Sequence, residues 1–170
     1  MLKRPRAELW TIMRDHLQDF AGNVADIDDI REIERTIDAD GAMRIVNEWR
    51  VRQQLPGALR AVLRSERLGW IDHNRWDASS GICSWTIEPD AIGEHIACSG
   101  ETRFADAMGG RGTRISFEGE LDIKPSLLGS LGPVAPMLSG VVESVVTTVI
   151  PRNLRAVAEA AAQFDRRDPG

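Results

Sequence analysis

Tyrosine is absent from this chain, and cysteine and histidine are scarce, with two and three residues among 170. The two cysteines, Cys83 and Cys98, form no CxxC pair and no Cys/His cluster, so a zinc site is not indicated and no metal site is expected. Both stand in strand-like segments, where we expect buried, unreactive thiols in a reducing compartment. The glycine-rich stretch 109–112 lacks the Lys-Ser/Thr ending of a phosphate-binding loop and is predicted to be a hairpin turn, so no cofactor is expected.

Long apolar runs and an excess of positive charge are also missing. The run from Val141 to Ile150 contains Glu143 and is far shorter than the roughly 20 residues of a membrane-spanning helix. The N-terminal segment has no apolar run typical of a signal peptide. The net charge is −5, whereas a nucleic-acid-binding protein needs a basic face to neutralise phosphates. We therefore expect a cytoplasmic protein with no stable membrane insertion and no nucleic-acid partner.

The clearest pattern that the chain does have is an amphipathic stretch near the C-terminus. From Val134 to about Phe164 apolar residues recur at helical spacing, which predicts one long helix. At 1.5 Å per residue such a helix would be roughly 45 Å long, enough to cross a small sheet. Pro151 should kink it, because proline removes one backbone hydrogen bond. The predicted apolar stripe consists of Leu138, Val141, Val142, Val145, Val149, Leu154, Val157, Ala158 and Ala161.

Upstream of this helix the apolar residues alternate with a period of two, which predicts about six antiparallel strands. A first helix, from Pro5 to about Phe20, precedes them, and the length and composition fit a single domain over residues 1–170. The predicted strands begin at about Ile30 and continue with Met43–Arg52, Leu68–Trp76, Ile82–Glu88, Ile92–Phe104 and Thr113–Ile123, with a hairpin turn at Asp38–Gly41. The residues predicted to face inward in the two clearest strands are Met43, Ile45, Asn47, Trp49 and Val51, and Ile115, Phe117, Leu121 and Ile123.

This order of elements resembles the START/Bet v 1/polyketide cyclase (SRPBCC) superfamily, in a bacterial branch. The resemblance covers nearly the whole chain and rests on an opening helix with Pro5 and Trp10, on the strands between Ile30 and Ile123, and on the terminal helix. The chain departs from the family in one respect, because the family usually has a strand before the first helix and only four residues precede Pro5 here. The resemblance implies an α+β helix-grip fold, in which a curved antiparallel sheet of six to seven strands wraps around the long C-terminal helix. It also implies a cavity for a lipid-like or aromatic ligand.

The candidate site residues are aromatic and apolar side chains, with one amide. Tryptophans in the predicted strands either line a pocket or fill the core between sheet and helix. Asn47 shares the face of Trp49 and, if buried, needs a partner, which is either a ligand or water in a cavity or a neighbouring protein group. The residues predicted to bind a ligand are Asn47, Trp49, Trp70, Trp85, Phe104, Phe117, Met137, Val141 and Val145.

No catalytic residue is assigned from the sequence. Asp72 and His73 are the best-placed candidates, but they point to opposite faces of one strand, so at most one of them can enter a cavity. A single titratable group without a partner favours a non-enzymatic protein that binds a small hydrophobic molecule. We expect the protein to be a monomer or a weak homodimer. Two alternatives stay open: a cyclase/aromatase-like enzyme that orients a polyketide-like chain, and an interaction module whose cavity is filled by its own side chains.

Overall fold

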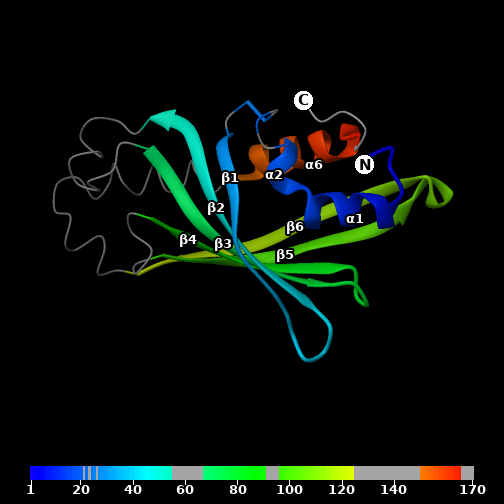
Figure 1. Ribbon diagram of the computed structural model, residues 1–170, viewed down its shortest axis with the longest axis horizontal. Helices are drawn as coiled ribbons and strands as arrows, with labels where there is room; N and C mark the ends of the chain where they lie inside the picture. The colour runs from blue at the N-terminus through cyan, green and yellow to red at the C-terminus, as the bar shows by residue number, and fades with distance from the viewer. Residues whose placement is uncertain are drawn as a thin grey trace.

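The computed structural model describes residues 1–20, 22, 24–25, 27–54, 67–90, 96–124 and 150–165. Within these residues six strands form one antiparallel sheet in which each strand pairs with the next along the chain, in the order β1-β2-β3-β4-β5-β6. The sheet is strongly curved and the helices lie on one side of it (Figure 1). The strands are β1 (Ile27–Ile37), β2 (Met43–Gln54), β3 (Arg67–Asp77), β4 (Ile82–Pro89), β5 (Ile96–Ala107) and β6 (Gly112–Ile123). The predicted α+β class with a six-stranded antiparallel sheet is confirmed.

The predicted turns and inward faces follow the hairpins of this sheet. Between β1 and β2 the N–H of Asp38 donates to the carbonyl of Ala42 at 2.8 Å, and Gly41 takes a φ of +85°, which a residue with a side chain rarely adopts. The 109–112 stretch lies in the β5–β6 turn, which includes a short 3-10 helix, η3 (Met108–Gly110). On β2, Ile45, Asn47, Trp49 and Val51 are buried and Met43 is partly buried, as the alternation predicts.

The N-terminal helix is shorter than predicted. Instead of one helix from Pro5 to Phe20 there are two, α1 (Arg6–Asp15) and α2 (Leu17–Phe20), because His16 leaves the helical region with φ −125° and ψ 16°. The break follows Asp15, whose carboxylate accepts hydrogen bonds from Arg14 at 2.7 Å and from Arg35 of β1 at 2.9 Å. This contact fixes the end of α1 to the sheet, so the chain turns there although the apolar periodicity continues.

The C-terminal helix, α6 (Ile150–Gln163), lies beside α1 and α2 over the same side of the sheet (Figure 1). Val157, Ala158 and Ala161 are between 0 and 4% exposed, and burial of the valine side chain alone contributes about 1.5–3 kcal/mol. Pro151 is the second residue of α6 as described. Residues 134–149 of the predicted long helix, and the kink that was predicted from Pro151, lie outside the described residues.

The core beneath α1 is aromatic. Trp10 meets Trp76 of β3 edge to face, with ring centroids 5.0 Å apart, and meets Phe104 of β5 at 5.1 Å. Such edge-to-face pairs add to the burial of apolar area because the ring quadrupoles are complementary. The first helix is therefore held to the middle of the sheet by its tryptophan.

The segment before α1 connects β6 with α6. Leu2 and Thr113 exchange two backbone hydrogen bonds of 2.9 Å, which form a single antiparallel β-bridge. Arg4 donates from Nε to the carbonyl of Ala162 at 3.0 Å. These contacts close one end of the space between the last strand and the last helix. No helix within the described residues is long and apolar enough to cross a membrane.

Candidate ligand-binding cavity

An inner cavity of about 70 Å³ lies between the sheet and α6, and α1 and α2 close one of its sides. Its walls are mostly aromatic and aliphatic, with a few polar groups from β2, β3, β5 and α6. This mixture is typical of small-molecule sites, where apolar surface provides affinity and a few polar groups fix orientation. The aromatic residues of the lining are Trp49, Trp70, Trp76, Trp85 and Phe117, and the polar ones include Asn47, Asp72, Asn74, Thr102 and Asn153.

Asp72 is the buried carboxyl group of this cavity. On β3 it pairs with Asn47 of β2, and Trp49 donates from its indole Nε1 to the Asp72 carboxylate at 3.1 Å. Burial in an apolar surrounding raises the pKa of Asp72 to about 6, although hydrogen bonds from Asn74, Trp49 and Asn47 act in the opposite direction. Asn74 in turn accepts from the Cys83 thiol at 3.4 Å. The carboxyl group is thus held by neutral donors and can change its protonation near neutral pH.

Asn153 of α6 faces the same cavity from the helix side. The residue is 3% exposed, and neither its Oδ1 nor its Nδ2 has a hydrogen-bond partner among the described residues. A buried amide without partners destabilises a fold by about 1–3 kcal/mol for each unpaired group. The cavity therefore offers an amide NH2 donor and a carbonyl acceptor that the described residues leave without partners.

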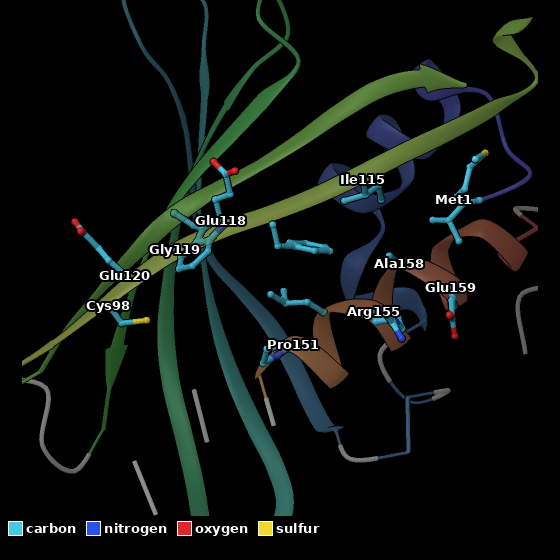
Figure 2. Close-up of a pocket in the computed structure, with 14 residues that line it drawn as sticks. Met1, Cys98, Ile115, Glu118, Gly119, Glu120, Pro151, Arg155, Ala158 and Glu159 are labelled. Carbon is cyan, nitrogen blue, oxygen red and sulfur yellow. The ribbon is translucent and has the colours of Figure 1, made fainter. Parts of the chain in front are cut away.

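A second, larger space lies on the other side of the cavity wall. This outer cleft has a volume of about 470 Å³ and runs between the edge of the sheet at β5 and β6 and the side of α6. Figure 2 shows Glu118, Gly119 and Glu120 on the strand side, and Arg155 and Glu159 on the helix side. Met1 and Leu2 lie at one end of the cleft, where the N-terminal segment bridges β6 and α6. The outer cleft and the inner cavity share three lining residues, Trp85, Phe117 and Leu154.

Trp85 owes its position to two glycines. In the sheet, Trp85 of β4 pairs with Gly100 of β5, and Gly100 pairs with Gly119 of β6. A Cβ atom on Gly119 would stand 2.5 Å from Cη2 of Trp85, so the indole lies directly across the bare backbone. Its Nε1 donates to the Thr102 hydroxyl at 3.2 Å. This placement of Trp85 over the two glycines was not predicted from the sequence. The signal was present, however, because both glycines interrupt apolar alternation at inward positions of neighbouring strands.

The predicted site residues are distributed as follows. Asn47, Trp49, Trp70, Trp85 and Phe117 line the inner cavity together, and Trp49 stacks on Trp70 with centroids 5.5 Å apart. Phe104 lies in the aromatic core beneath α1 and lines neither space. Residues 137, 141 and 145, which are Met137, Val141 and Val145, lie outside the described residues.

The other candidate for chemistry, His73, and the two cysteines have different surroundings. His73 is on the outer face of β3, with Nε2 3.8 Å from Glu88. Cys83 and Cys98 are free and buried, and burial raises the pKa of both thiols, for Cys83 with a further contribution from Asp72. Within the described residues no group of three or more His, Cys, Asp or Glu side chains is arranged to hold a metal ion.

Comparison with known proteins gives matches by structure alone. No protein-family model matches the sequence, and no curated protein sequence matches it significantly. The structure is similar to that of TTHA0849 from Thermus thermophilus, with a TM-score of 0.65, 13% identity, and coverage of 95% of this chain and 92% of that one. It is also similar to the ZhuI aromatase/cyclase from Streptomyces sp. R1128, with a TM-score of 0.66, 17% identity, and coverage of 95% and 89%.

A third similar structure is the di-domain aromatase/cyclase StfQ of the steffimycin biosynthetic pathway, with a TM-score of 0.54 and 16% identity. The alignment covers 95% of this chain and 41% of StfQ. At these identities the similarity is one of fold, in the curved antiparallel sheet and the helix that packs against it. The fold of this chain is therefore the helix-grip fold, in which a curved antiparallel sheet packs around a C-terminal helix.

Proposed function

We propose that the protein binds a small, largely apolar molecule in the space between the sheet and α6. The observation that carries this proposal is the unpaired, 3% exposed amide of Asn153 in a cavity with aromatic walls. Apolar burial would supply most of the affinity, at about 25 cal/mol per Å² before the entropy losses of association. The amide would fix the orientation of the ligand.

The proposed binding residues are those that line the inner cavity. Asn47, Trp49, Trp70, Trp85 and Phe117 contact the ligand or the groups that hold it, and the contributions of residues 137, 141 and 145 remain predictions. The proposed binding unit is residues 1–170 acting as one domain, in a monomer or weak homodimer. Light scattering during size-exclusion chromatography tests the oligomeric state.

The test of this proposal is a titration with N-phenyl-1-naphthylamine, an uncharged probe whose emission rises in apolar surroundings. We expect saturable binding that also lowers tryptophan emission, because several tryptophans line the cavity. Leu154→Trp places a bulky ring in the shared wall and should abolish binding, whereas Gln163→Trp adds the same ring at an exposed position of the same helix and should not. Absence of probe binding to the wild type, or equal binding by both variants, would contradict the proposal.

A second candidate function is that of an aromatase/cyclase-like enzyme. The observation that favours it is Asp72, a cavity carboxyl whose pKa is raised to about 6 and which could therefore take or give a proton near neutral pH. ZhuI and StfQ, which share the fold, are aromatase/cyclases. Turnover of a polyketide-like chain distinguishes the two candidates.

A further inference from the structure

The sizes of the two spaces limit what each can hold. The inner cavity of about 70 Å³ is about half the size of the ~150 Å³ engineered cavity that accommodates benzene. It therefore has room for a small polar group and not for the body of a lipid or an aromatic ring system. The outer cleft of about 470 Å³ is large enough for that body.

The two spaces are neighbours across one wall. Trp85, Phe117 and Leu154 each line both of them, so a molecule in the cleft contacts the same side chains that bound the inner cavity. Trp85 rests on the bare backbone of Gly100 and Gly119 and is attached through a single side-chain hydrogen bond, to Thr102. A ligand in the cleft thus has to pass this wall to bring a polar group to Asn153.

The charge in the inner cavity disfavours an anion. The cleft itself does not decide the charge of the ligand, because Glu159 stands beside Arg155 on α6 and the side chains of Glu118 and Glu120 point away from α6 (Figure 2). In the inner cavity, Asp72 accepts only from neutral donors.

The nearest other cation is not available to a ligand. Arg14 also lines the inner cavity, but its guanidinium is already paired with the Asp15 carboxylate through two hydrogen bonds of 2.9 and 2.7 Å. By sequence, residues 125–149 contain one charged residue, Glu143, which is also acidic. In the inner cavity a ligand carboxylate would therefore lose its hydration without gaining a free cationic partner among the described lining residues.

Resting on the function proposed above, we propose that the ligand is an uncharged molecule whose apolar body lies in the outer cleft and whose terminal hydroxyl or carbonyl group reaches Asn153 past Trp85. A hydroxyl group both donates and accepts, so it can satisfy the Oδ1 and the Nδ2 of Asn153, and a carbonyl can satisfy the Nδ2. The corresponding carboxylate only accepts, and it would stand near the Asp72 carboxylate. The site therefore discriminates by charge as well as by shape.

The experiment compares two ligands with the same ring, 2-(naphthalen-2-yl)ethanol and naphthalen-2-ylacetate, as competitors of N-phenyl-1-naphthylamine at pH 7.5. We expect the alcohol to bind at least about tenfold more tightly than the carboxylate, because close like charges and lost hydration oppose the anion. If the probe binds and the two ligands compete equally, if the carboxylate is the better competitor, or if neither competes, this inference is wrong while the proposed function stands. If the probe itself does not bind, the proposed function fails.

Two variants locate the polar group. Asn153→Leu keeps the branching at Cγ but removes both polar groups. It should lower the affinity for the alcohol about fivefold without lowering that for 2-ethylnaphthalene, which lacks the hydroxyl. Asp72→Asn should raise the affinity for the carboxylate more than the affinity for the alcohol. Thr86→Val, exposed on the outer face of β4, is the matched control and should change neither.

The contrary results are equally specific. If Asn153→Leu lowers the affinities for the alcohol and for 2-ethylnaphthalene equally, Asn153 only shapes the cavity. Asn153→Ala repeats this comparison in case the leucine variant folds poorly. If Asp72→Asn leaves the ratio of the affinities for the alcohol and the carboxylate unchanged, the Asp72 carboxylate does not repel the anion. Either result overturns the inference.

Discussion

Asp72 and Asp15 show how the surroundings of a carboxyl group decide its behaviour in this fold. Asp15 accepts from the guanidinium groups of Arg14 and Arg35, and these hydrogen bonds lower its pKa to about 2. Asp72 receives only neutral indole and amide donors, so the loss of hydration on burial dominates and its pKa rises to about 6. The first is part of a charge network at the end of α1, whereas the second is a group of the cavity that can exchange a proton.

The raised pKa of Asp72 predicts an unusual dependence of stability on pH. The folded pKa of about 6 exceeds the unfolded value of 3.8, so this group contributes full stability below pH 3.8 and loses it as the pH rises through 6. The loss amounts to roughly 3 kcal/mol. Asp72→Asn removes this slope, so its free energy of unfolding relative to wild type should rise between pH 4 and pH 7. Urea titrations at both pH values measure the difference, and parallel curves would show that the carboxyl is not buried.

The glycines under Trp85 give a second prediction at this scale. Gly119→Ala forces the indole to move, because the new Cβ would stand 2.5 Å from Cη2 of Trp85 and 3.0 Å from the carbonyl of Ser99. We expect a loss of about 1–3 kcal/mol in the free energy of unfolding, as for other overpacked sites. A shift in tryptophan emission should accompany it. Gly22→Ala is the control, because nothing lies within 4 Å of its Cβ position. Equal effects of the two substitutions would contradict the placement of Trp85.

At the scale of elements, α6 can be tested through its two sides. Val157→Asp places an unpaired charge at a position that is 1% exposed, between the helix and the sheet, and should lower the free energy of unfolding by several kcal/mol. Glu159→Ala, two residues away on the exposed side, should change it by less than about 0.5 kcal/mol. Equal effects in a urea titration would mean that α6 is rotated about its axis.

The strands and their inward faces could be read from the sequence, because an antiparallel sheet with one covered face needs strict alternation. The exception is β3, where Asp72 and Asn74 occupy one face and His73 and Arg75 the other, so that both faces look polar. The pairing with β2 decides between them, since Trp49 stands opposite Trp70 and Asn47 opposite Asp72. Which face of β3 points inward is therefore determined by its pairing with β2 and cannot be read from the sequence of β3 alone.

The break at His16 and the position of Phe104 were not predictable for a related reason. The apolar periodicity runs on through Leu17 and Phe20, whereas α1 ends at Asp15, which contacts Arg35 on β1. Phe104 has the alternation of a cavity residue, but Trp10 of α1 covers it. Both outcomes depend on how α1 packs against the sheet, and a single sequence does not give this packing.

At the scale of the whole molecule, the fold follows from the order and patterning of elements. Structures that share only 13 and 17% identity with this chain superpose over 95% of it. Alternation in six strands and one apolar helix face are enough to specify such an arrangement, because many different apolar residues can fill the same core. The division into an inner cavity and an outer cleft depends instead on single residues, above all on Trp85, Gly100 and Gly119.

The choice between a binding protein and an enzyme also belongs to this scale, because it depends on how many proton-transferring groups the assembled cavity contains. General acid–base catalysis of a cyclisation needs a proton-transferring group within hydrogen-bond reach of the substrate, and a second such group can return the proton. Among the described residues that line the inner cavity, Asp72 is the sole carboxyl group, the Cys83 thiol is held protonated by its raised pKa, and His73 lies on the opposite face of the sheet.

The proposal that the protein binds a ligand without transforming it predicts no catalysis of polyketide cyclisation. A poly-β-ketone thioester incubated with wild type, Asp72→Asn or His73→Ala should give the spontaneous products of buffer at the buffer rate, followed by liquid chromatography and mass spectrometry. Asp72→Asn should nevertheless raise the affinity for naphthalen-2-ylacetate, whereas His73→Ala should not, because only Asp72 faces the cavity. A wild-type rate above buffer that falls by about 100-fold or more in Asp72→Asn and survives in His73→Ala would establish the enzyme instead, with Asp72 as its acid–base group.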